Sequence, residues 1–402
     1  MSPLAQCCGI VMILVLLYFF RRQKKVHLHT EQAFFHLTCC ALLCLCLDIS
    51  SIIVIDRRDI LSPYFVAFIA KFYITTLPLT VLFAMVYVCS DIYASNISTR
   101  KIKRLCLILG ILTFATIFIL PIQYHENSQG TVLYTEGPSV VATYISVALY
   151  MLFLVYHTAK NKHILNKRRI HAVWVWLLLW TIAACIQLFN NELLIVGYAG
   201  SLGIMIIYLS LENPEANIDR RTGLFNRNAL LQYLQQLYGD RQTFSLLSLV
   251  LETSYVQNLN TDSQEQAHLE MINFVESVKN AYVFKNADEE IILIFHSKKD
   301  ADAGKEMIDL RFEQGFGKDY SVIFRTSWIY IPESTIAQSE DELLAFLRYA
   351  RQNLLKERRF CVVNQSVVEE MIQEKSMEEL MIGAINRNAV EVYYQPIYST
   401  RE

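Results

Sequence analysis

Three consecutive acidic residues, Asp288, Glu289 and Glu290, stand between two short apolar runs in the second half of the chain. Carboxylates gathered on a tight turn are the groups that hold Mg²⁺ for displacement reactions at phosphorus. Acidic residues are also common in hairpin turns, where water solvates them and no function is required. Both interpretations apply to this run, and we favour the solvated turn.

Two further ionisable residues, Asp48 and Lys71, lie inside long apolar runs. An ionised side chain in hydrocarbon costs about 2.5 to 3.5 kcal/mol or more unless it is paired or hydrated. Each residue lies about seven positions from the outer end of its run, roughly 10 Å deep at a helical rise of ~1.5 Å per residue. We therefore predict that Asp48 and Lys71 pair inside a membrane. The alternative is that each side chain snorkels or lines a small hydrated cleft.

The composition indicates a membrane protein. Of the 402 residues 53% are apolar, which is too many for a purely soluble chain. The net charge of -2 offers no excess of basic residues to neutralise a phosphate backbone, so nucleic acid is not an expected partner. The lipid bilayer is the partner that the composition predicts.

Nine of the ten cysteines precede residue 219, and most of them fall within apolar runs, as Cys39, Cys40, Cys44 and Cys46 do. No Cys-x-x-Cys and no His/Cys metal spacing accompanies them, which favours packing over a haem or metal role.

Seven apolar runs come near the ~20 residues that a helix needs to cross the hydrocarbon core. The basic connections 21–25, 100–104 and 160–169 alternate with an outer connection, 123–138, that has Glu126 and Glu136 but no Lys or Arg. Because basic loops stay in the cytoplasm, the pattern predicts an outer N-terminus and cytoplasmic residues from 212 onward. The predicted spans are Leu4–Phe20, Ala33–Ile55, Tyr64–Val88, Leu105–Ile122, Ser139–His157, Ala172–Phe189 and Leu193–Leu211.

The remaining chain reads as a soluble α+β domain. Apolar spacing predicts helices, strands and a hairpin around the acidic run in a βαββαβ-like order. This order indicates a ferredoxin-like fold, with helices on an antiparallel sheet. The predicted helices are 229–238, 263–279, 302–313 and 340–356, and the predicted strands are 243–251, 282–284, 291–295 and 320–330.

The junction run Asp219-Arg220-Arg221-Thr222-Gly223-Leu224-Phe225-Asn226-Arg227 resembles the D-x-L-T-G-L-x-N-R entry sequence of GGDEF domains, bacterial domains that make cyclic di-GMP from GTP. This resemblance implies that the hairpin should carry Gly-Gly-Asp-Glu-Phe, with carboxylates that hold Mg²⁺ and glycines that admit GTP. The matching residues here are Ala287-Asp288-Glu289-Glu290-Ile291, and Lys285 stands where the family usually has Arg.

Much of the family's chemistry is missing. Leu251 and Thr253 occupy the two positions of the family's Asp-x-Asp metal site, with Glu252 on the opposite face, and Val278 and Ala281 occupy those of its Arg-x-x-Asp inhibition motif. Ala in place of glycine would add roughly 1 to 2 kcal/mol of strain wherever φ is positive. No catalytic set is intact and no metal site is complete, so we expect no cyclase activity. Binding of GTP or cyclic di-GMP without turnover stays open.

The end of the chain resembles the opening of an EAL domain, the cyclic di-GMP phosphodiesterase barrel. A helix at 377–388 precedes the string A-I-x-x-x-x-V-x-V-Y-Y-Q-P-I-Y-S, in which Gln395 matches a family position near the metal-bound water. The resemblance implies Mg²⁺ or Mn²⁺ for a complete EAL domain. The other catalytic carboxylates would lie beyond Glu402, so we interpret the chain as a fragment that holds no cofactor itself.

Together these features predict a multi-pass protein of the bacterial inner membrane that acts in cyclic di-GMP signalling. It should be inactive as a cyclase, and its complete form should be an EAL phosphodiesterase. The alternatives are a non-catalytic sensor or scaffold controlled by the spans, and a seven-span receptor with an incidental tail; a homodimer is open. The predicted parts are a seven-helix input module at 1–211, a linker at 212–217, a degenerate GGDEF-like domain at 218–363, a linker helix at 364–376 and the EAL start at 377–402.

Overall fold

The computed structural model forms two compact units, one of residues 1–220 with 228–241 and one of residues 221–227 with 242–402. Each unit is described by itself. The structure describes residues 3–92, 98–126, 132–161, 167–189, 195–211, 217–252, 261–287, 289–317, 322–355, 359–387 and 389.

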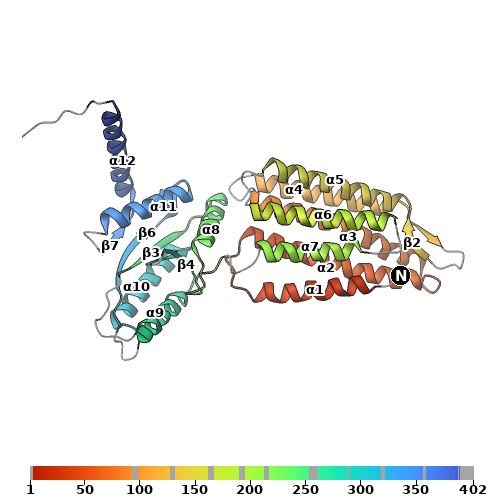
Figure 1. The fold of residues 1–402 in the computed structure, drawn as a ribbon, viewed down its shortest axis with the longest axis horizontal. Coiled ribbons are helices and arrows are strands. Elements are labelled where there is room, and N and C mark those ends of the chain that lie inside the picture. The colour runs from red at the N-terminus through yellow and green to blue at the C-terminus, as the bar shows by residue number, and fades with distance from the viewer. Residues whose placement is uncertain are drawn as a thin grey trace, which may run out of the picture. The chain divides into compact units, whose positions relative to one another are not determined.

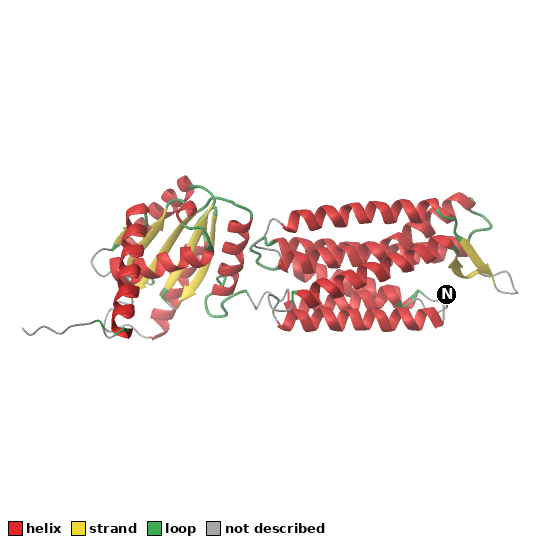
Figure 2. Cartoon of the chain, turned by 90° about the horizontal axis from the view of Figure 1, so that it is seen from above, coloured by secondary structure: helices red, strands yellow, loops and turns green. Residues whose placement is uncertain are grey.

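The first unit is a helical bundle (Figures 1 and 2). Within the described residues, six of its helices are long and apolar enough to cross a membrane. Val196–Leu211 is apolar too but has only 16 residues, so the predicted seventh span is shorter than the others. The helices are α1 (Leu4–Arg22), α2 (His29–Asp56), α3 (Pro63–Ile92), α4 (Ser98–Ile119), α5 (Pro138–Lys160), α6 (Lys167–Phe189), α7 (Val196–Leu211) and α8 (Arg227–Gly239).

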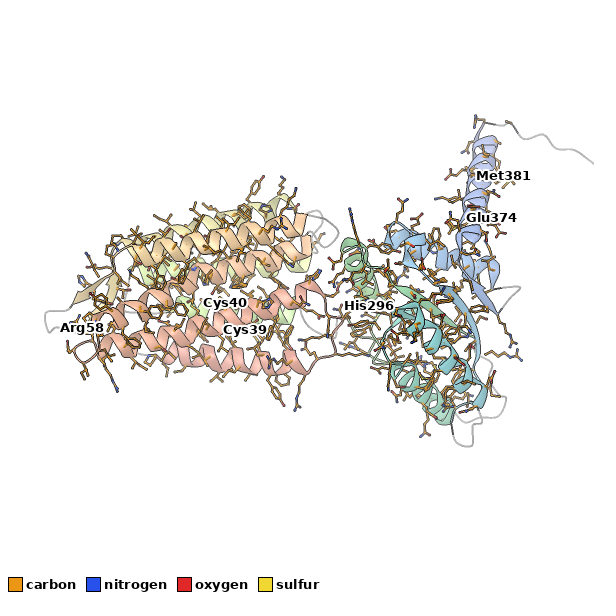
Figure 3. The ribbon with its side chains drawn as sticks, turned by 180° about the vertical axis from the view of Figure 1, so that it is seen from behind. Cys39, Cys40, Arg58, His296, Glu374 and Met381 are labelled. Carbon is orange, nitrogen blue, oxygen red and sulfur yellow. The ribbon has the colours of Figure 1, made fainter. Side chains whose placement is uncertain are left out.

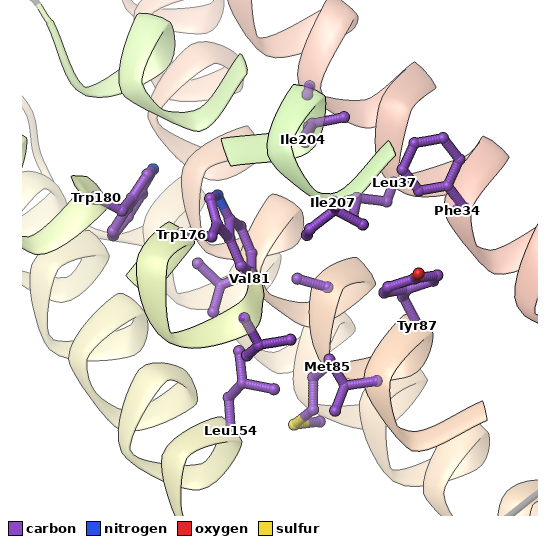
Figure 4. Close-up of a cluster of buried hydrophobic side chains, with 14 of the residues drawn as sticks. Phe34, Leu37, Val81, Met85, Tyr87, Leu154, Trp176, Trp180, Ile204 and Ile207 are labelled. Carbon is purple, nitrogen blue, oxygen red and sulfur yellow. The ribbon is translucent and has the colours of Figure 1, made fainter. Parts of the chain in front are cut away.

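The bundle is held by apolar and aromatic side chains that face inward from several helices (Figure 4). Phe34, Tyr87 and Trp176 are almost fully buried. Gly203 on α7 makes room for Trp176 on α6, because a Cβ on this glycine would lie 1.5 Å from the indole Cδ1. Many large apolar side chains of α1, α4, α5 and α6 are exposed instead, as expected for surfaces that face lipid.

Of the ten cysteines, Cys40, Cys44, Cys89, Cys106 and Cys361 are buried, and Cys7, Cys8, Cys46 and Cys185 are exposed. Cys39 and Cys40 lie within the bundle (Figure 3), and all ten cysteines are free thiols. Between α4 and α5, strand β1 (Gln123–Glu126) pairs antiparallel with β2 (Val132–Glu136), so the outer connection forms a small hairpin.

The second unit is a five-stranded sheet with helices, in the strand order β4-β5-β3-β6-β7. Its strands are antiparallel except for β6 and β7, which run parallel. The elements are β3 (Ser245–Glu252), α9 (Thr261–Glu276), β4 (Ala281–Ala287), β5 (Glu290–Phe295), α10 (Lys298–Gln314), β6 (Arg325–Ile331), a 3-10 turn (Ser334–Ile336), α11 (Glu340–Tyr349), a π-helical turn (Ala350–Leu354), β7 (Phe360–Val362) and α12 (Gln365–Asn386).

The core of this unit lies between the sheet and helices α9 and α10. Leu249, Leu293 and Phe295 from the strands are fully buried with Met271 of α9 and Ile308 of α10. The predicted hairpin and the predicted helix-and-strand order are present. In place of the expected strand at 320–330, the structure has β6 from Arg325 to Ile331, and β7 was not predicted.

The helix α12 runs without a break from Gln365 to Asn386, across position 376, where the linker helix was predicted to end. Glu374 and Met381 project from it (Figure 3). The predicted EAL strand, with Gln395, lies outside the described residues.

Candidate functional site

The hairpin between β4 and β5 carries the residues that match the GGDEF positions. Lys285 pairs with Ile291 and Ala287 with Glu290, and an irregularity in the register separates these pairs at Asn286. On the other side of the hairpin, the Leu251 amide donates to the Glu289 carbonyl at 2.8 Å. The neighbouring strand β3 therefore holds the hairpin backbone on its β5 side.

Glu290 is the centre of a hydrogen-bonded cluster. Its side chain is buried, and its Oε1 accepts from Ser248 Oγ on β3 at 2.6 Å. Its Oε2 accepts from Asn286 Nδ2 at 2.9 Å and from Arg351 at 3.3 Å. A buried carboxylate is stable when it is paired and hydrogen bonded, and Glu290 meets both conditions.

The positive charge at this carboxylate comes from Arg351, in the π-helical turn after α11. Its guanidinium lies 3.3 Å from Glu290 and 4.0 Å from Glu289, and the side chain is 36% exposed. Because the pair with Glu290 is half-buried, water screens it less than an ion pair on the open surface. Arg351 thus supplies the positive charge that faces Glu290 in this cluster.

The residues present do not fit a Mg²⁺ or Mn²⁺ site of the expected kind. Leu251, at one of the metal-ligand positions, is 4% exposed and packs in the apolar core. Within the described ranges there is no group of three or more His, Cys, Asp or Glu side chains that could hold a metal ion. Thr253, Asp288 and the side chain of Glu252 lie outside the described residues.

The expected strain at Ala287 is not seen. Ala287 belongs to β4 and is not among the described residues with positive φ, so a Cβ is tolerated at this position.

A cavity of about 310 Å³ opens beside Glu290. It contains three arginines and one carboxylate, which favours an anionic ligand, and guanidinium groups bind phosphate oxygens with good geometry. The lining residues are Arg227, Asn286, Ala287, Glu290, Leu344, Leu347, Arg348 and Arg351.

Sequence reasoning found the hairpin but missed its partners. Ser248 is a polar residue within a mainly apolar strand. The arginines lie far from the hairpin in sequence, with 61 positions between Glu290 and Arg351. Arg227 belongs to the run 219–227, whose sequence does not indicate that this side chain lines a cavity. The alternation of side chains along β3 could have placed Ser248 next to the hairpin, but no local pattern indicates the arginines.

The predicted pair of Asp48 and Lys71 is wrong. Lys71 Nζ donates to the Phe118 carbonyl at 2.9 Å, and Asp48 Oδ2 accepts from Gln6 Nε2 at 3.0 Å. Equal depth in two helices does not fix the direction in which each side chain points. Lys71 turns towards α4 and Asp48 towards α1.

Comparisons with protein families, curated proteins and solved structures gave matches among the solved structures. No family model matches the chain, and no curated protein does. Among solved structures, it is similar to the GGDEF domain of FimX from Pseudomonas aeruginosa, with 17% identity over 37% of this chain and 99% of that chain at a TM-score of 0.31. It is also similar to the diguanylate cyclase SiaD in complex with its activator SiaC from Pseudomonas aeruginosa, with 16% identity over 55% of this chain and 90% of that chain at a TM-score of 0.31.

Proposed function

We propose that the chain is a membrane-anchored protein of cyclic di-GMP signalling whose GGDEF-like domain does not make cyclic di-GMP. The observation that carries this proposal is the pairing of Glu290 with Arg351. A carboxylate that already binds a guanidinium, a hydroxyl and an amide has little capacity left for a divalent metal. Since Leu251 supplies no second carboxylate, the described residues of this site do not offer the ligands that two-metal phosphoryl chemistry needs.

The anionic ligand that suits the arginine-lined cavity is a guanine nucleotide, either GTP or cyclic di-GMP. Arg351 shares its charge with Glu290, and Arg227 and Arg348 add two guanidinium groups that can bind phosphate oxygens without a metal ion. In this proposal the domain binds nucleotide and leaves it unchanged, and it acts as a sensor or scaffold for the membrane unit.

Nucleotide binding by the full chain in nanodiscs tests this function. Isothermal titration with GTP and with cyclic di-GMP, in EDTA, should give saturable binding of at least one nucleotide. The double substitution Arg348→Ala with Arg351→Ala should weaken that binding at least tenfold, while Arg241→Ala, which is outside the cavity, should not. If neither nucleotide binds, a membrane receptor with an incidental soluble tail is the better account.

We further propose that the string at 384–399 begins an EAL-type phosphodiesterase domain. The support is the sequence A-I-x-x-x-x-V-x-V-Y-Y-Q-P-I-Y-S alone. Sequencing the gene past codon 402 tests this directly. An open reading frame that encodes Glu-Ala-Leu and further acidic strand ends would support it, and an immediate stop codon would count against it.

A further inference from the structure

A buried carboxyl group stands at the meeting point of four membrane helices. Asp48 of α2 is 2% exposed, in a bundle whose inner face is otherwise apolar apart from scattered hydroxyl and amide side chains. An uncompensated negative charge at such a place would cost several kcal/mol. The Asp48 carboxyl group is therefore stable only if it is paired with a cation or protonated.

The contacts of Asp48 are with neutral groups. Oδ2 accepts from the amide of Gln6 on α1 at 3.0 Å, and the Tyr73 hydroxyl of α3 lies within hydrogen-bonding reach of the carboxyl. On the α7 side the helix comes close, because a Cβ on Gly197 would lie 3.9 Å from Oδ2. The other carboxyl oxygen, Oδ1, is buried and has no hydrogen-bond partner.

No side chain in the described part of the bundle supplies a positive charge to this carboxyl. Lys71 is held by the Phe118 carbonyl on α4, and α7 contains no charged residue. The titratable groups that face Asp48 are the Cys44 thiol on α2 and the Tyr73 hydroxyl, with Tyr144 of α5 behind Tyr73. Thiols and phenols are neutral at physiological pH, so none of them compensates a carboxylate.

We propose that Asp48 is a proton-binding site of the folded bundle. The carboxylate takes one proton from solvent onto Oδ1, and the resulting O–H donates to Oε1 of Gln6. The acid and the amide then share two hydrogen bonds, since the Gln6 amide presents one donor and one acceptor side by side. Both carboxyl oxygens have partners in this arrangement.

Proton binding at Asp48 is coupled to the packing of α1 against α2. When the proton leaves, Oδ1 and the Gln6 amide oxygen are both acceptors and repel each other, and a buried charge remains. The repulsion and the cost of the buried charge both decrease if α1 moves away from α2 or if water enters. The protonated form is the tightly packed form, so pH on the side from which Asp48 is reached biases the membrane unit.

Infrared spectroscopy of the full chain in nanodiscs at pH 7 tests the proposal. The C=O stretching band of a protonated carboxylic acid should be present in the wild type, lost in Asp48→Asn and retained in Asp56→Asn, which removes an exposed carboxyl at the end of the same helix. Gln6→Met should weaken the hydrogen bond and shift the band to higher frequency. If Asp48→Asn removes only carboxylate bands, Asp48 is ionised and the proposal is overturned.

Thermal unfolding provides a second measurement. The folded wild type keeps a proton that the unfolded chain releases above about pH 4, so its stability should fall as pH rises from there. Asp48→Asn should remove this contribution to the dependence of stability on pH, and Asp56→Asn should leave it unchanged. An identical slope in the wild type and Asp48→Asn, or stabilisation of the wild type by Na⁺ that Asp48→Asn abolishes, would mean that the site does not hold a proton.

Discussion

At the scale of single residues, the pair of Glu290 and Arg351 gives the acidic hairpin a structural role. Glu290 is buried, and three donors from β3, the hairpin and the turn after α11 converge on it. The carboxylate has a structural part in this arrangement, because it ties the end of α11 to the sheet. We therefore expect Glu290 to matter for stability rather than for turnover.

Arg351→Ala should destabilise the soluble domain by about 1 to 3 kcal/mol, because it leaves a buried carboxylate with neutral donors only. The measurement is thermal unfolding of the full chain, read from the transition of the second unit. Adding Glu290→Gln should recover part of the loss, since the charge is then gone. A double variant that loses the sum of the two single effects would show that the two residues do not interact.

Because of His268, we expect the stability of the same domain to depend on pH. Burial lowers the pKa of His268 below its usual value, and Arg221 and Lys285 lower it further, against a small opposing effect of Glu265. Between the folded pKa and about 6.5 the unfolded chain binds the proton and the folded chain does not, so stability falls as pH drops below about 6.5. His268→Gln should flatten the stability curve between pH 5 and 7, and an unchanged slope would contradict this assignment.

Residue patterns predicted the acidic hairpin between β4 and β5, but they did not predict which side chains contact it. Contacts such as Ser248 with Glu290 depend on strand order, which the sequence does not state. The failure of the Asp48 and Lys71 pair has a similar cause. Depth follows from counting along a helix, whereas direction depends on how each helix is turned about its axis.

At the scale of elements, hydropathy and spacing were reliable guides. The described membrane helices follow the predicted apolar runs, and α8, α9, α10 and the β4–β5 hairpin lie close to their predicted positions. The short strand β7 was missed because three residues, Phe360 to Val362, are too few to show alternation. The shorter β6 shows that an apolar run does not by itself fix where pairing begins.

Close packing of α6 on α7 gives a prediction at this scale. Gly203→Ala should destabilise the bundle, because the new methyl group would overlap the Trp176 indole, which fills that space. The matched control is Gly110→Ala, where a Cβ would meet Leu79 at an ordinary 3.4 Å. Thermal unfolding in nanodiscs should show a lower midpoint for Gly203→Ala than for Gly110→Ala, and equal midpoints would contradict the close approach.

At the scale of the whole molecule, a second unit that binds GTP must lie in the cytoplasm, where GTP is available. The basic connections motivate this sidedness. Reporter fusions after Glu136 and after Leu211 should report opposite sides of the membrane. If both fusions report the same side, the chain crosses the membrane an even number of times between them, and the predicted seven-span arrangement is wrong.

The measurement that tests the central claim most directly is cyclic di-GMP synthesis by the purified full chain. With GTP and ample Mg²⁺ or Mn²⁺, mass spectrometry should detect no cyclic di-GMP and no matching release of pyrophosphate, in the wild type as in Glu290→Gln. Synthesis by the wild type that Glu290→Gln abolishes would show that Glu290 serves a metal in spite of Arg351, and the account would be wrong.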